Sequence, residues 1–193
     1  MDPLVMLEPR PAIAEFPDAL SKAACERIIA QFEREPGKGP GVIFTPDGRE
    51  QVDLALKRST DYLIKPDSDT EWLEIDRLLS GTLQRALQVY TKQFRLLPNL
   101  PTTFCAFQIQ RTQVGESFGW HADEDRRRRL AIIFYLNDDF VGGETEFELQ
   151  DFSYKPRRGS LLLFPPYWTH VHRGREVEQG TKYIATAFLL HAE

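Results

Sequence analysis

The sequence predicts a mainly β domain, a β-sandwich or barrel, with two helices packed on it. Before residue 100, two segments repeat apolar residues with the period of a helix. From residue 102 onward, short runs of Phe, Ile, Leu and Val alternate with Gly, Pro, Asn and Asp. Short strands separated by turn residues are typical of sandwiches and barrels. We therefore expect residues 1–193 to form one domain, with a helical part (about 1–100) packed on a β core (about 101–193).

Two amphipathic patterns define the helices. The first helix is expected over residues 21–35, with Ser21 as its N-cap. Its apolar stripe consists of Cys25, Ile28, Ile29 and Phe32, at i, i+3, i+4 and i+7. The second is expected over about 69–95, where Ser68 and Glu71 have capping-box spacing. Its stripe consists of Trp72, Ile75, Leu79, Leu83, Ala86, Tyr90 and Phe94.

Apolar runs bounded by turn residues define the strands. The alternation of Val52, Leu54 and Leu56 gives a weak further strand signal in the first half of the chain. In the second half the expected strands are 103–111, 117–121, 130–136, 144–149, 160–164, 168–172 and 182–190.

Charge and cysteine usage exclude several classes of protein. The net charge of −5 argues against a nucleic-acid binder, which needs a basic face. The two cysteines, Cys25 and Cys105, form no CxxC or CxxH spacing, so a cysteine zinc site is excluded and a reducing compartment is expected. The N-terminus lacks a signal-peptide pattern, and the longest apolar run, Leu130–Leu136, is too short to span a bilayer. We therefore expect a cytoplasmic protein without membrane contact; no feature specifies its oligomeric state.

A metal site is indicated by the spacing of His121 and Asp123. In an extended segment, residues i and i+2 point to the same side, so these two side chains can bind one ion together. A third imidazole from a distant strand, His170 or His172, would complete a set of two histidines and one carboxylate. That set leaves coordination positions open and suits Fe(II) oxygenases. An HxD triplet alone is weak evidence, because such a pair also occurs in surface turns.

An ordered series of motifs accompanies this triplet. It comprises Trp120–Asp123, Tyr135–Asn137, Gly142–Phe147, Gly159–Phe164, and His172 with Lys182 ten residues later. From about residue 12 to its end, the chain resembles the prolyl 4-hydroxylase-like branch of the 2-oxoglutarate- and Fe(II)-dependent dioxygenases. The resemblance implies a double-stranded β-helix, a jelly roll of cupin-like type.

The resemblance also implies roles for individual residues. His121, Asp123 and His172 match the iron ligands, and Lys182 matches the basic residue that binds the far carboxylate of 2-oxoglutarate. Thr186 and Tyr135 match hydroxyl groups that support this carboxylate. The implied cofactors are Fe(II), 2-oxoglutarate as co-substrate, O2, and ascorbate as reductant. Because the basic residue follows the distal histidine by nine or ten positions in relatives, the spacing favours His172 over His170.

This sequence departs from the relatives at two positions. Many relatives have tyrosines where this chain has Thr112 and Phe118, which leaves the expected co-substrate hydrogen bonds incomplete. The run Arg126–Arg129 is expected to be a solvated loop and strand start, with contact to an acidic substrate as the alternative.

The expected function is hydroxylation of a C–H bond, foremost by a prolyl 4-hydroxylase acting on a peptide or protein. The alternative is the same chemistry on a free amino acid or another small molecule. A nucleic-acid demethylase is disfavoured by the net charge and by a lysine at the co-substrate position. A non-enzymatic jelly-roll binding module is disfavoured because such a module needs no metal site with open positions.

Overall fold

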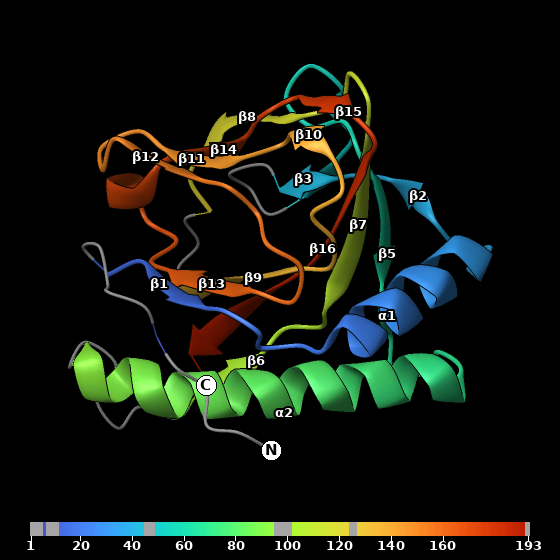
Figure 1. Cartoon of the computed structure of the whole chain (residues 1–193), viewed down its shortest axis with the longest axis horizontal. Coiled ribbons are helices and arrows are strands. Elements are labelled where there is room, and N and C mark those ends of the chain that lie inside the picture. The colour runs from blue at the N-terminus through green and yellow to red at the C-terminus, as the bar shows by residue number, and fades with distance from the viewer. Residues whose placement is uncertain (1–5, 7–11, 45–48, 95–101, 124–126, 192–193) are drawn as a thin grey trace.

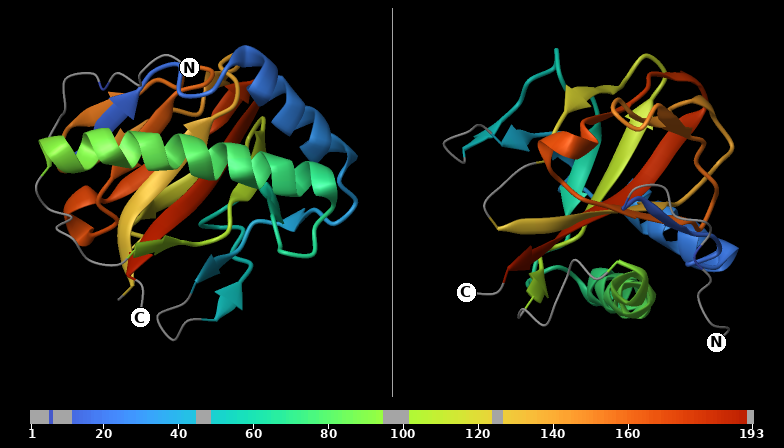
Figure 2. Two further views of the ribbon diagram at one scale, coloured as in Figure 1. Left: turned by 90° about the horizontal axis from the view of Figure 1, so that it is seen from below. Right: turned by 90° about the vertical axis from the view of Figure 1, so that its left-hand side faces the viewer.

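The protein is built from two antiparallel sheets that face each other, with both helices on the outer side of the larger sheet (Figure 1; Figure 2). This architecture comes from a computed structural model that describes residues 6, 12–44, 49–94, 102–123 and 127–191. Neither helix of the described part of the chain is long and apolar enough to cross a membrane.

The first helix, α1, spans Lys22–Arg34 and confirms the prediction for this segment. The backbone of Ser21 is extended, and its side chain accepts a hydrogen bond from the amide of Ala24. Such a bond satisfies one of the free N–H groups at a helix N-terminus.

The second helix, α2, spans Thr70–Gln93, close to the predicted bounds, but its predicted cap was wrong. Asp69 is the N-cap and accepts from the amide of Trp72. The hydroxyl of Ser68 instead accepts from the amide of Lys65 and shares a hydrogen bond with the hydroxyl of Tyr62. Ser and Asp are both favourable N-cap residues, so only these contacts show which of the two caps α2.

The larger sheet has the strand order β1-β13-β9-β16-β7-β5-β2, with β6 also paired to β16. Its strands are β1 (Ala14–Phe16), β2 (Gly39–Pro40), β5 (Thr60–Leu63), β6 (Thr102–Phe104), β7 (Gln108–Gln113), β9 (Arg128–Tyr135), β13 (Leu161–Phe164) and β16 (Thr181–His191). The smaller sheet has the order β12-β11-β14-β8. Its strands are β8 (Phe118–His121), β11 (Thr145–Phe147), β12 (Phe152–Tyr154) and β14 (His172–Gly174).

Two short antiparallel pairs complete the described strands. They are β3 (Ile43–Phe44) with β4 (Glu50–Gln51), and β10 (Val141–Gly142) with β15 (Val177–Gln179). From β7 to β16, the chain passes repeatedly between the larger and the smaller sheet. This alternation is the double-stranded β-helix, so the predicted fold class is confirmed.

Three strand predictions needed correction. Residues 168–172 do not form one strand, because Trp168–His170 is a 3-10 helix and β14 begins only at His172. Pro165 and Pro166 precede this turn, and proline cannot donate to a sheet ladder. The exposed ring of Trp168 (65% accessible) lies on this turn.

The predicted strand at 103–111 is divided in two. β6 pairs with the end of β16, whereas β7 pairs with its beginning, and the chain leaves the ladder between them. Phe107 is buried in this interval within the core beneath the helices.

The weak strand at Val52–Leu56 was wrong. The carboxylate of Asp53 accepts hydrogen bonds from the amides of Ala55 and Leu56, which closes a turn. Leu54 is 63% exposed, so its apolar alternation does not mark a buried face.

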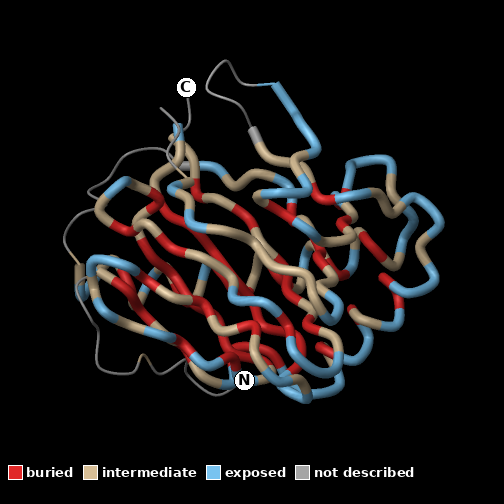
Figure 3. The backbone as a smooth tube through the Cα atoms, turned by 90° about the horizontal axis from the view of Figure 1, so that it is seen from above, coloured by how far each residue is buried: buried red, intermediate tan, exposed pale blue. Residues whose placement is uncertain are grey.

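Two layers of apolar side chains hold the fold together. The larger core lies between the helices and the outer face of the large sheet, and includes Phe32, Trp72, Leu83 and Phe134. The smaller core lies on the inner face and includes Tyr135, Phe147 and Phe164. Figure 3 shows these buried segments running through the middle of the molecule beneath an exposed rim. The space between the sheets that this second core does not fill forms the candidate active site.

Candidate active site

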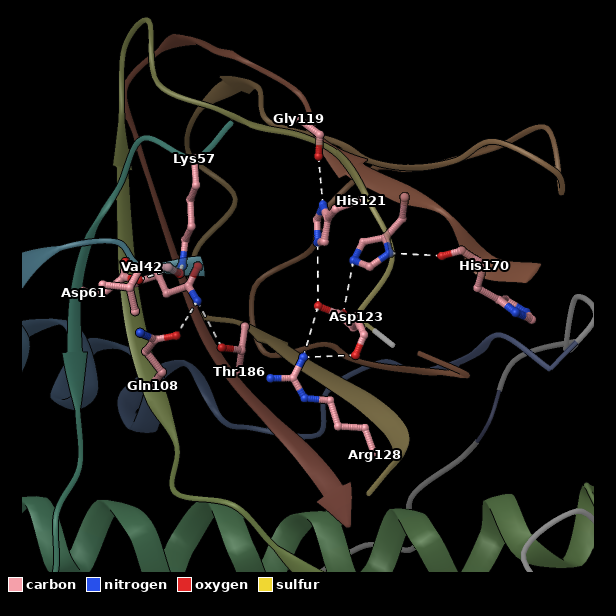
Figure 4. Close-up of polar contacts among 12 residues, drawn as sticks. Val42, Lys57, Asp61, Gln108, Gly119, His121, Asp123, Arg128, His170 and Thr186 are labelled. Atoms are coloured by element: carbon pink, nitrogen blue, oxygen red, sulfur yellow. Dashed lines mark hydrogen bonds and ion pairs between the residues drawn. The ribbon is translucent and has the colours of Figure 1, made fainter. Parts of the chain in front are cut away.

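The structure brings the three predicted iron ligands together in the smaller sheet. His121 ends β8, Asp123 follows it, and His172 begins β14 directly opposite His121 in the strand register. One ligand atom from each residue lies within 4.8 Å of the other two. Nε2 of His121 is 3.7 Å from Oδ1 of Asp123, and Nε2 of His172 is 3.5 Å from Oδ2 (Figure 4).

Backbone carbonyls orient both imidazole rings. Nδ1 of His121 lies 2.8 Å from the carbonyl oxygen of Gly119, and Nδ1 of His172 lies 3.0 Å from that of His170 (Figure 4). A carbonyl only accepts, so each Nδ1 carries the hydrogen and each Nε2 presents a lone pair toward Asp123. The ring of Phe118 stacks on His121 with centroids 3.6 Å apart and so holds its plane.

The local electrostatics suit metal binding. Burial, together with the nearby His172, lowers the pKa of His121 to about 4. The imidazole is therefore neutral near pH 7, the form in which histidine is a ligand. Two neutral imidazoles and one carboxylate on one side of an ion fit the facial donor set of non-haem Fe(II).

The second candidate histidine, His170, lies elsewhere. The predicted strand 168–172 would place its side chain on the same face as that of His172, but His170 belongs to the 3-10 helix. Its ring bonds to the hydroxyl of Thr169, while its carbonyl oxygen orients His172. Of the two histidines, the structure brings only His172 into the cluster with His121 and Asp123.

A cavity of about 1270 Å³ opens beside these ligands. Its walls come from the inner faces of both sheets and from the segments around Ile43 and Lys57. The predicted site residues that line it are His121, Asp123, His172, Lys182 and Thr186.

Lys182 is a buried cation in this cavity. It is 5% exposed, and its ammonium donates to the carbonyl oxygen of Gly143 at 2.7 Å. Burial lowers its pKa to about 8. In the described part of the chain, no carboxylate lies within ion-pair distance of this ammonium. A buried charge is costly without a counter-ion, so the site suits an anionic ligand.

Of the two hydroxyl groups predicted to support the co-substrate carboxylate, one lines the cavity and the other does not. Thr186 lines the cavity on the same strand as Lys182. Tyr135 is fully buried, and its hydroxyl shares a hydrogen bond of 2.7 Å with the hydroxyl of Thr145, which does line the cavity. A direct contact between Tyr135 and the co-substrate stays a prediction.

Two glutamines of the site were missed by the sequence analysis. Gln108 and Gln110 lie on β7 next to Thr186 and line the cavity. Their i, i+2 spacing, continued by Thr112, was the available signal. A buried pair, Lys57 with Asp61 at 2.7 Å, was missed as well, and it lies near Gln108 and Thr186, across from His121 (Figure 4).

The arginine run lies partly at the cavity. Arg127 and Arg128 line it, whereas Arg126 is outside the described residues. Arg128 donates to the carbonyl oxygen of Asp123 at 3.0 Å, and its guanidinium lies over the ring of Phe188. Arg128 is therefore a structural neighbour of the predicted metal ligand Asp123 as well as part of the cavity wall.

Comparison with known proteins places this geometry in a class. Residues 107–190 match the family model of the 2OG-Fe(II) oxygenase superfamily. This part of the chain is therefore a 2OG-Fe(II) oxygenase domain, and membership implies Fe(II), 2-oxoglutarate and O2 as its cofactors. The predicted resemblance is confirmed.

Among curated proteins, the human procollagen-lysine,2-oxoglutarate 5-dioxygenase 2 is 28% identical over 189 residues, 96% of this chain and 24% of the relative. A putative prolyl 4-hydroxylase of Acanthamoeba polyphaga mimivirus is 33% identical over 67 residues, 31% of this chain and 28% of the relative. The chain thus spans about a quarter of the length of these curated relatives.

Several solved structures with a similar fold are prolyl hydroxylases. A viral collagen prolyl hydroxylase of Paramecium bursaria Chlorella virus-1, in complex with 2-oxoglutarate, has a TM-score of 0.72 and 18% identity and covers 94% of this chain and 97% of its own. A Trichoplax adhaerens prolyl hydroxylase in complex with a hypoxia-inducible-factor peptide has a TM-score of 0.75 and 15% identity, with coverages of 93% and 84%. At these identities the likeness establishes the fold.

Proposed function

We propose that this protein is an Fe(II)- and 2-oxoglutarate-dependent dioxygenase that hydroxylates a C–H bond of a prolyl residue in a peptide or protein. The proposal rests on one observation: a candidate metal-binding cluster and a buried cation line the same cavity. Two imidazoles and a carboxylate converge at one wall, and the buried cation Lys182 lies in the same cavity. This is the pair of contacts that a chelating dicarboxylate co-substrate requires.

Each residue has a defined task in this proposal. His121, Asp123 and His172 hold the iron, and the carbonyls of Gly119 and His170 keep the two imidazoles turned toward it. Lys182 binds the far carboxylate of 2-oxoglutarate. Bound iron, with 2-oxoglutarate and O2, supplies the oxidative decarboxylation of the co-substrate and the insertion of oxygen into the C–H bond. The protein supplies geometry and shields the reacting atoms from water.

The size of the cavity favours a peptide over a free amino acid. Sites for drug-sized ligands commonly measure about 300–1,000 Å³, and this cavity measures about 1270 Å³. Its volume can hold 2-oxoglutarate together with several residues of an extended chain. Hydroxylation of a free amino acid or another small molecule is the second candidate.

The proposal is tested by incubating the iron-loaded protein aerobically with 2-oxoglutarate, ascorbate and separate panels of proline-containing peptides and free amino acids. Mass spectrometry should show a gain of one oxygen on a peptidyl proline, coupled to succinate. An oxygen gain confined to free amino acids supports the second candidate. Absence of succinate under all conditions, with iron bound, contradicts the enzymatic proposal.

We also propose ascorbate as the reductant and a cytoplasmic location. The proposal of ascorbate rests on the chemistry of 2-oxoglutarate-dependent dioxygenases, because a reductant returns the iron to the ferrous state after uncoupled turnover. The location rests on the two cysteines, Cys25 and Cys105, which are both free thiols. Multiple-turnover assays with and without ascorbate, and fractionation of cells that express the protein, test the two points separately.

A further inference from the structure

A buried ion pair lies at the wall of the cavity, across from His121 (Figure 4). The ammonium of Lys57 donates to Oδ2 of Asp61 at 2.7 Å, and the hydroxyl of Ser59 donates to Oδ1 at 2.7 Å. The two charged side chains are only 4% and 5% exposed. Gly41 packs against this cluster, because a Cβ there would lie 2.9 Å from Cε of Lys57. The desolvation of two buried charges can cancel their attraction, so stability alone does not account for the pair.

The ammonium of Lys57 also contacts the ring that orients a predicted metal ligand. Nζ of Lys57 lies over the ring of Phe118, 5.3 Å from its centroid. At this distance a cation is attracted by an aromatic ring. The same ring stacks on the imidazole of His121, with centroids 3.6 Å apart and an angle of 10° between the planes. Lys57 therefore reaches His121 through a single side chain.

The backbone around Lys57 holds the strand that carries His121. β8 is the last strand of the smaller sheet, and Lys57 pairs with Phe118 at its outer edge in an antiparallel bridge. The amide of Gly119 donates to the carbonyl oxygen of Leu56 at 2.7 Å. The carbonyl oxygen of Gly119 is in turn the group that orients Nδ1 of His121. This segment therefore holds both neighbours of the imidazole, the ring that stacks on it and the carbonyl that orients it.

The ion pair connects this edge with the larger sheet. Asp61 lies on β5, where it pairs with Gln110 of β7. We propose that Lys57 is a positioning residue for the metal site: anchored by Asp61, it holds the ring of Phe118 against His121 and so keeps Nε2 of this imidazole directed at the metal. The inference rests on the proposed function, in which His121 is an iron ligand.

The test compares metal affinity with overall stability in a variant that removes both charges together. Lys57→Met with Asp61→Asn leaves no buried charge without its partner, which would be strongly destabilising. The dissociation constant of Fe(II) alone is measured anaerobically by competition with a chromogenic chelator, and the urea midpoint by circular dichroism. The paired variant should bind Fe(II) roughly tenfold more weakly, the lower end of the loss typical for groups that orient a metal ligand. The visible spectrum of Co(II), bound in place of Fe(II), should change too, because it follows the arrangement of the donors.

Leu79→Ala is the control for lost stability, because Leu79 is fully buried in the core beneath the helices and does not line the cavity. It should lower the urea midpoint but leave the Fe(II) affinity and the Co(II) spectrum as in the parent protein. Phe118→Leu should weaken Fe(II) binding at least as much as the paired variant. If Lys57 acts through Phe118, the two losses do not multiply when the substitutions are combined.

Three outcomes overturn the inference. They are unchanged Fe(II) affinity in the paired variant, an equal loss of affinity in Leu79→Ala, and losses that multiply in the combination with Phe118→Leu. If the paired variant does not fold, Lys57→Met with Asp61→Leu takes its place, and unchanged Fe(II) affinity in Phe118→Leu overturns the inference without either pair. Failure of the proposed function looks different, because the parent protein would then bind no Fe(II), or bind it without forming succinate from 2-oxoglutarate.

Discussion

His121 and His172 face each other directly across strands β8 and β14, with ring centroids 4.2 Å apart. The chain visits the larger sheet twice, through β9 and β13, between these two strands. The antiparallel register therefore creates the histidine pair, and Asp123 needs to reach only the space beside it. A site assembled in this way depends on each of its three donors.

The anionic donor is the first to test. Asp123→Ala should abolish iron retention and 2-oxoglutarate turnover, because it removes the one carboxylate of the donor set. Metal analysis after gel filtration and a succinate assay provide the measurements. Asp67→Ala, at an exposed turn position, is the control and should retain both properties. Full activity of the Asp123 variant would exclude this residue as a ligand.

The two neighbouring histidines should behave differently. His172→Ala should lose iron, because Nε2 of this ring points into the site. His170→Ala should retain iron, since its contribution to His172 is a backbone carbonyl that the substitution preserves. Any loss of iron affinity in His170→Ala should stay below 10–100-fold, the loss typical when a residue that orients a metal ligand is removed. The reverse pattern of iron contents would overturn the choice of His172.

Removal of the buried cation should affect the co-substrate and spare the metal. Lys182→Ala should raise the dissociation constant of 2-oxoglutarate roughly tenfold to a hundredfold, the loss typical of a charge-assisted hydrogen bond. Iron content should remain that of the parent protein. Lys155→Ala, at an exposed position, controls for loss of a positive charge. An unchanged 2-oxoglutarate requirement would place the carboxylate site elsewhere.

The same lysine predicts a pH dependence. Because burial lowers the pKa of Lys182 to about 8, the ligand-free protein carries the cation below this pH and loses it above. Binding of a carboxylate favours the charged form of Lys182. Above pH 8 the protein therefore takes up a proton when it binds 2-oxoglutarate. The dissociation constant of 2-oxoglutarate should therefore be flat below pH 8 and rise up to about tenfold per pH unit above it. Lys182→Arg keeps its charge over this range and should remove the rise; a flat profile in the parent protein to pH 10 contradicts the prediction.

Substitution of Tyr135 tests whether its hydroxyl stabilises the fold or binds the co-substrate. In Tyr135→Phe the buried hydroxyl of Thr145 loses its partner, which should lower the free energy of unfolding by about 1–3 kcal/mol. Adding Thr145→Val should recover part of this loss, since neither group then remains unpaired. Urea unfolding measures both variants. Unaltered stability combined with weaker 2-oxoglutarate binding would instead show that the Tyr135 hydroxyl serves the co-substrate.

Local sequence patterns predicted those features that depend on short stretches of chain. The apolar period of 21–35 predicted α1 almost to the residue, and apolar runs bounded by turn residues predicted β9, β13 and β16 of the large sheet. The i, i+2 relation of His121 and Asp123 predicted that both side chains could reach one ion, because strand geometry alone brings them to one side.

Tertiary structure decided what depends on packing between distant segments. Ser68 and Asp69 are equivalent caps by type, and only the fold gives Ser68 a partner in Tyr62. The separation of His170 from the metal ligands required the turn after Pro166 to leave the sheet. Gln108 and Gln110 became site residues because β7 pairs with β16, which places them beside Thr186. Sequence thus determined the periodic elements and the candidate metal ligands, whereas strand pairing, a long-range property, decided which other side chains surround them.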